Sequence, residues 1–224
     1  FYSLNLLSGQ KNMPSLKLPK GFEVWNRKLH IYVGLYFLLF IWLFSFSGLM
    51  LNHPNWEFTR YWQRRQENVT VHQIQPLIEK EDMARAREVM AQLKVSGEIE
   101  HIQVLLKERR FKFRVNRPGR MIDIWVNWEG DRAEMKEITT DGWGVLHMLH
   151  QFNGVRMDDS KEARDWFVTK LWTFSMDALC LGLIFLILSS LYMWYQIQKK
   201  RRLGLIVLGT GVLCCGAFIF GLVG

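Results

Sequence analysis

The chain has 224 residues and a net charge of +8, from 29 Lys and Arg against 21 Asp and Glu. Nine of the basic residues lie in two short segments, 1–30 and 196–202, beside a single acid, so the excess charge argues against a nucleic-acid surface. The three cysteines all lie in apolar runs, which excludes an internal disulfide in the polar part and covalent haem attachment through C-x-x-C-H.

Three apolar runs, at 31–51, 171–195 and 203–224, are each long enough to cross a bilayer. A helix of about 20 residues spans a ~30 Å hydrocarbon core at ~1.5 Å per residue. We therefore predict transmembrane helices at 31–52, 171–196 and 203–224. The first run precedes Asn52-His53-Pro54 rather than a small-residue cleavage site, so we expect it to persist as a membrane helix.

Charge placement predicts the orientation of these helices. The positive-inside rule places the segment 1–30 and the hairpin 197–202 in the cytoplasm. The long segment 53–170 holds 20 Lys and Arg against 19 Asp and Glu, and we expect it outside. The carboxyl end of the third helix is then also outside.

The polar segment combines a helical pattern with alternating strands. Apolar residues at three- and four-residue spacing predict an amphipathic helix over 81–94, with Met83, Ala86, Met90 and Leu93 on one face. Alternation follows at 102–106, 111–115 and 122–128, separated by turn residues. We predict an α+β membrane protein with one helix and a three- or four-stranded antiparallel meander. The aromatic and apolar stretch 142–152 predicts a short helix on the outer membrane surface.

Three motifs resemble the PepSY-associated transmembrane family. They are R-K-L-H-I-Y-V-G-L at 27–35 continuing to S-G-L-M-L-N-H at 47–53, the helix with its meander, and L-H-M-L-H at 146–150 before a helix that ends Y-M-W-Y at 192–195. The resemblance covers nearly all of 25–195. It implies a bacterial inner-membrane protein with a single extracytoplasmic PepSY-like domain. Similar members carry b-type haem and reduce siderophore-bound iron, and others have no assigned activity; the reductase members usually have four or more membrane helices.

Four histidines lie where a membrane haem site would need them. His30 and His53 bound the first helix and are about 35 Å apart along its axis, so they cannot ligate one iron. His53, His147 and His150 are all expected near the outer face, where one b-type haem would be ligated by His53 and one of the other two. His30 would need a ligand from another subunit. The alternative is that these histidines only cap helices or bind headgroups.

Two further features concern the membrane helices. Asp177 lies inside the second apolar run, where a carboxylate facing lipid costs roughly 2–3 kcal/mol. A hydrogen bond between helices or proton relay would explain it. Glycines at six positions of the run 203–224 predict close packing on other membrane subunits or on a second copy.

Three functions remain open at this stage. The chain could be a haem-dependent oxidoreductase or electron-transfer subunit, a non-catalytic accessory subunit that stabilises a larger membrane complex, or a PepSY-type regulatory module. No nucleophile with its base, phosphate-binding glycine loop or dinucleotide fingerprint is present in the sequence. Electrons would therefore enter from a quinone or a partner subunit.

Overall fold

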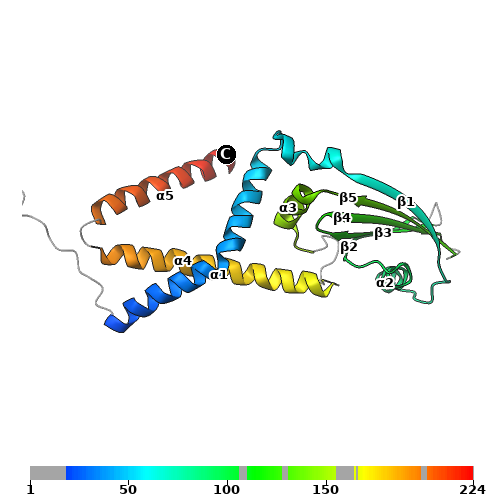
Figure 1. The fold of residues 1–224 in the computed structure, drawn as a ribbon, viewed down its shortest axis with the longest axis horizontal. Coiled ribbons are helices and arrows are strands. Elements are labelled where there is room, and N and C mark those ends of the chain that lie inside the picture. The colour runs from blue at the N-terminus through cyan, green and yellow to red at the C-terminus, as the bar shows by residue number, and fades with distance from the viewer. Residues whose placement is uncertain are drawn as a thin grey trace, which may run out of the picture. The chain divides into compact units, whose positions relative to one another are not determined.

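The computed structural model describes residues 19–105, 110–127, 131–154, 164, 166–197 and 201–223. The chain forms two compact units, and the long helices α1 and α4 each contribute to both (Figure 1). One unit contains α1 up to Leu38 and the chain from Leu179 onward, and the other is Leu39–Ala178. The two units are described separately below.

Three helices among the described residues are long and apolar enough to cross a membrane, as predicted. They are α1 (Lys20–Asn52), α4 (Phe167–Gln196) and α5 (Arg201–Val223). Helix α1 begins eleven residues before its apolar run, because the polar residues 20–30 continue the helix and include an i,i+4 pair between Glu23 and Arg27. It ends just before His53, whose following proline disfavours helical backbone.

In the first unit, α1 and α4 pack antiparallel through small residues. Gly34 faces Leu186, where an added Cβ would lie 3.9 Å from Cδ2 of that leucine. Gly182 lies so close to the ring of Phe37 that a Cβ would clash with it. Glycine at position 182 therefore allows the close approach of the two helices, whereas position 34 would also accommodate a Cβ.

Helix α5 makes little contact with the rest of its unit. No residue of its apolar span is buried. Its first turns are the exception, since Gly204 lies against the indole of Trp194, and the Arg201 guanidinium lies 4.3 Å from the Tyr195 ring centroid. The remaining surface of α5 is left for lipid or another protein.

The second unit contains a five-stranded antiparallel sheet with the order β1-β5-β4-β3-β2 (Figure 1). Its strands are β1 (Gln66–Gln73), β2 (Glu98–Leu105), β3 (Arg110–Arg117), β4 (Arg120–Asn127) and β5 (Arg132–Thr139). The prediction of three or four strands was therefore short of the observed number. Strand β1 precedes the helix in sequence and pairs with β5 at the edge of the meander.

Helix α2 (Asp82–Leu93) covers one face of this sheet and builds the core. Its Ala86 and Val89 are fully buried against Phe113 and Ile124, which the strand alternation had placed on one face. The β3–β4 hairpin turns at Gly119, whose φ of 83° favours glycine. The expected helix and the two central strands are thus confirmed in position and in buried face.

The opposite face of the sheet is polar. Arg114 donates to both carboxylate oxygens of Asp123, at 2.7 and 3.1 Å. Lys136 pairs with Glu67 across β5 and β1, at 2.8 Å. Charged pairs of this kind keep an uncovered sheet face soluble without adding much stability.

Candidate functional site

Two short 3₁₀ helices follow α1 and begin the region that contains the predicted histidines. These are η1 (Glu57–Thr59) and η2 (Tyr61–Arg64). The Thr59 hydroxyl is buried and lies 2.9 Å from the His53 carbonyl and 2.7 Å from the Trp56 carbonyl. This contact ties η1 to the turn that follows the end of α1 at Asn52.

Helix α3 (Gly142–Gln151) carries the other two outer histidines and confirms the helix expected at 142–152. Its N-cap is Asp141, whose Oδ1 accepts a hydrogen bond from the Gly144 N–H at 3.0 Å. Gly144 itself is buried, and a Cβ there would clash with Thr140 and with the ring of Tyr61. Glycine at this position lets α3 lie directly on η2.

His150 is held by a residue of α1. Its Nδ1 lies 2.7 Å from Oγ of Ser47, a residue with no exposed surface. The Ser47 hydroxyl donates its single hydrogen to the Phe44 carbonyl at 3.2 Å, so it accepts the bond from His150 Nδ1–H. In the His150 tautomer that carries its hydrogen on Nδ1, the ring donates to Ser47 and the lone pair lies on Nε2.

The surroundings of His150 are aromatic. The Phe44 ring lies 5.2 Å from the imidazole, and Trp172 stacks on Phe44 at 6.1 Å. Trp172 also donates from Nε1 to the Phe152 carbonyl at 3.1 Å, which ties the start of α4 to the end of α3. An imidazole with one fixed nitrogen and apolar neighbours is well suited to bind a metal through the other nitrogen.

His147 faces η2 rather than α1. Its ring lies 4.8 Å from that of Tyr61. Burial, and then the nearby His150, lower the pKa of His147, and burial raises the pKa of Tyr61. At neutral pH His147 is therefore the neutral imidazole that a metal requires.

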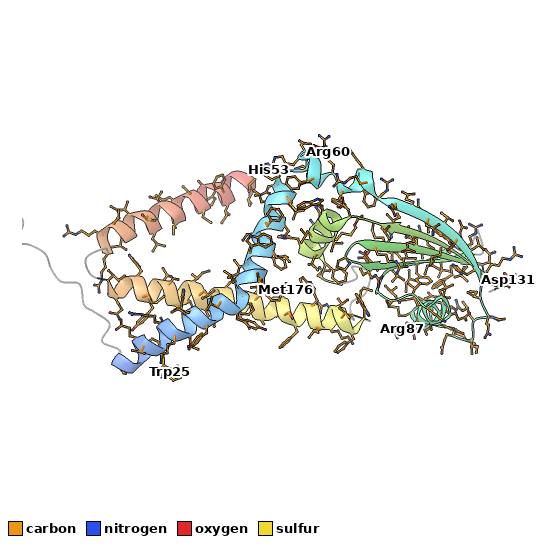
Figure 2. The ribbon with its side chains drawn as sticks, in the orientation of Figure 1. Trp25, His53, Arg60, Arg87, Asp131 and Met176 are labelled. Carbon is orange, nitrogen blue, oxygen red and sulfur yellow. The ribbon has the colours of Figure 1, made fainter. Side chains whose placement is uncertain are left out.

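His53 lies apart from these contacts. It is exposed and stacks on Trp56, with ring centroids 4.2 Å apart and planes 10° from parallel. A series of aromatic contacts continues from Trp56 to Phe58 and from Phe58 to Trp143. Figure 2 shows His53 at the opposite end of this unit from Asp131, which lies between β4 and β5.

The structure thus gathers the expected residues only in part. His147 and His150 share α3, but no hydrogen bond or ring contact in the described part of the chain joins His53 to either of them. His30 belongs to the other unit, where its Nδ1 lies 3.2 Å from Ser189 Oγ. Asp177 is exposed on α4.

Ser47 is the residue of this region that sequence reasoning missed. It lies in the S-G-L-M-L-N-H motif, but the contact with His150 joins residues 103 positions apart. Gly48, the next residue, was a sequence signal for this contact, because a small residue lets a second helix approach. In the structure, a Cβ added at Gly48 would lie 3.5 Å from the His150 ring.

A six-coordinate b-type haem of the kind predicted from the sequence takes two axial imidazoles, and an apolar surround shields it from water. His150 fits the role of one such ligand, because Ser47 fixes its Nδ1 and the rings of Phe44 and Trp172 lie beside it. The described residues contain no group of three or more His, Cys, Asp or Glu side chains that could hold a bare metal ion.

Comparison with protein-family models, with curated proteins and with solved structures found no match for this chain.

Proposed function

We propose that this chain is a PepSY-type integral membrane protein that binds a b-type haem through His150 and takes part in membrane electron transfer or ferric-chelate reduction. The supporting observation is the hydrogen bond that fixes His150 Nδ1 on buried Ser47. Histidines that bind metals usually have their second nitrogen fixed in this way.

The second axial ligand comes from His53 or from another chain. His147 and His150 are three residues apart on α3, so they cannot approach one iron from opposite sides. His53 is exposed, and Trp56 stacks on one face of its ring. Its imidazole nitrogens therefore remain accessible for ligation.

The remaining side chains would set the environment of the cofactor. Bound haem supplies one-electron chemistry that no amino-acid side chain here provides. Ser47 orients the His150 ring, while Phe44 and Trp172 keep water from one side of it. In this proposal the sheet domain and the histidines lie on the outer side of a bacterial inner membrane.

The test is the absorption spectrum of the full chain purified from haem-replete cells. The reduced protein should show the sharp α and β bands of a six-coordinate low-spin haem. His150→Ala should abolish these bands. Ser47→Ala should keep the ligand but weaken haem affinity by about 10- to 100-fold, because it removes a hydrogen bond outside the metal shell.

His72 provides the matched control. It is exposed on β1, where its Nε2 lies 3.0 Å from the hydroxyl oxygen of Thr70. His72→Ala should leave the spectrum unchanged. A colourless wild-type protein, purified with its native partners, would contradict the proposal.

An accessory subunit is the second candidate, and the exposure of α5 favours it. The apolar span of this helix has no buried residue, so beyond its first turns it offers most of its surface to another membrane subunit or a second copy. A colourless protein that stays bound to a larger membrane complex would support this role.

A further inference from the structure

A groove of about 530 Å³ lies between α1 and α4 within the unit that contains His30. Helix α1 contributes His30 and Gly34, and α4 contributes six side chains between Leu183 and Trp194. All six except Ser190 are apolar or aromatic. The groove is thus an apolar space in a pair of candidate membrane helices, with an imidazole in its wall.

The absence of a Cβ at Gly34 keeps this groove open. An alanine there would still be accommodated, since its Cβ would meet Leu186 only at 3.9 Å. A large side chain at the same position would extend into the groove instead. Ile187 and Leu191, which also line it, are exposed, so a ligand could enter from the lipid side.

The contact with Ser189 sets the chemistry of His30. Ser189 is 3% exposed, and its hydroxyl has no other hydrogen bond in the described part of the chain. Its hydrogen is therefore available to His30 Nδ1, 3.2 Å away. A neutral imidazole that accepts at Nδ1 carries its hydrogen on Nε2. In the tautomer that accepts from Ser189, His30 therefore offers an Nε2–H donor to the groove.

The lining limits which ligands can bind. Among the described residues that line the groove, none carries a permanent charge, so a phosphate or carboxylate headgroup would lack a counter-ion. A hydrocarbon chain alone would leave the His30 donor unpaired. The indole of Trp194 adds a flat surface on which a planar ring can stack.

We propose that this groove binds a lipid-soluble quinone, with one ring carbonyl accepting a hydrogen bond from His30 Nε2 and the isoprenoid tail along the α4 leucines. A quinone combines a neutral acceptor, a planar ring and a long apolar tail, which are the features that the lining selects. The site is independent of a haem at His150.

The experiment uses the full chain in phospholipid nanodiscs and an azido-ubiquinone photoprobe with a decyl tail. Labelling should saturate and map to peptides that contain residues 30–34 or 183–194. Gly34→Phe should fill the groove and reduce labelling at least tenfold. Gly209→Phe is the matched control and should have no effect, since nothing lies within 4 Å of a Cβ at that position.

Two further variants test the hydrogen bond. His30→Leu keeps an apolar wall but removes the donor, and it should weaken probe binding about tenfold, the equivalent of one hydrogen bond in a membrane protein. Ser189→Ala should weaken binding less, because His30 keeps its imidazole but loses the contact that fixes the hydrogen on Nε2.

Three results would overturn the proposal. Equal labelling of Gly34→Phe and Gly209→Phe would place the probe elsewhere. If a saturated phospholipid competes with the probe as well as unlabelled decylubiquinone does, the groove binds acyl chains in general and not a quinone. Loss of a haem absorption band in His30→Leu would show that the groove holds haem. Because spectra and labelling are recorded on the same samples, failure at His150 and failure at His30 are distinguishable.

Discussion

Asp141 connects α3 to the segment that follows α1 through one carboxylate. Its Oδ1 accepts from Gly144 N–H at 3.0 Å, and its Oδ2 accepts from Arg64 Nε at 2.8 Å. Arg64 also donates to the Glu57 and Phe58 carbonyls. Burial raises the pKa of Asp141, but the bonds from Gly144 and Arg64 act in the opposite direction, and the net pKa lies below its usual range.

Asp141→Ala should therefore lower the stability of the full chain by about 1 kcal/mol through loss of the N-cap. A lowered pKa means that the charged form of Asp141 is stabilised by folding. The contribution of this charge to the stability of the chain is therefore complete above an aspartate's ordinary pKa of about 4. It is lost as the pH falls through the lower, folded pKa. Thermal unfolding in detergent should show the difference between wild type and variant at pH 7 and a smaller difference at pH 2.

Asp131 supplies the control, because its side chain is 65% exposed and the oxygen–nitrogen distance of its ion pair with Arg132 is as long as 4.0 Å. Asp131→Ala should leave the unfolding temperature unchanged. A difference for Asp141→Ala that is equally large at both pH values would rule out the electrostatic part of this account.

The same residue type prepares two histidines for different ligands. Ser47 donates to a backbone carbonyl and must accept from His150, whereas Ser189 is free to donate to His30. A serine hydroxyl that donates to its own helix thus favours a lone pair on the far nitrogen of the histidine, and one that donates to the histidine favours a hydrogen there.

At the scale of elements, the central strands give a direct test of register. Phe113 is fully buried under α2, and Phe113→Ala should cost about 3–5 kcal/mol, enough to unfold a small domain. Lys112 points to the other face, where its Nζ lies 5.1 Å from the Trp125 ring centroid. Lys112→Ala should cost no more than about 1 kcal/mol. Limited proteolysis of the full chain would measure both, and similar losses would refute the assigned register.

Helices and strands whose apolar residues recur at a regular spacing were predictable from the sequence. Strands that are fixed mainly by backbone hydrogen bonds to a neighbouring strand were not. Helix α2 and strand β4 show clear periods, and they were expected near their observed bounds. Strand β1 has only Val69 and Val71 as apolar residues, and both are more than half exposed on this edge strand. No burial pattern marked it, because its pairing with β5 fixes it instead.

The candidate site was predictable by residue type but not by contact. Histidines near helix ends indicated the region, yet the Ser47–His150 and Ser189–His30 contacts join residues 103 and 159 positions apart. Each contact depends on how closely two helices approach. Gly48 lies beside the first contact, and Gly34 lies one turn from His30 in the second. The small residues can be read from a sequence, but the distant residues that pack against them cannot.

For the whole molecule, the distribution of charge predicts orientation. Four basic residues stand together at 199–202 between two apolar helices, and five more lie within 1–30. Moving such clusters across a bilayer is unfavourable, whereas the near-neutral segment 53–170 carries no comparable bias. The arrangement therefore favours a cytoplasmic hairpin with the sheet domain on the other side.

Single cysteines test this orientation in intact cells. In a background where Cys180, Cys214 and Cys215 are replaced by serine, Asp131→Cys should react with a membrane-impermeant maleimide added outside. Arg202→Cys should react only after the inner membrane is opened, because position 202 belongs to the basic cluster that is expected in the cytoplasm. Both positions are exposed, so burial would not prevent the reaction. If both react from the same side, the proposed orientation is wrong. If that side is the cytoplasm, His147 and His150, which share a unit with Asp131, cannot serve an extracytoplasmic acceptor.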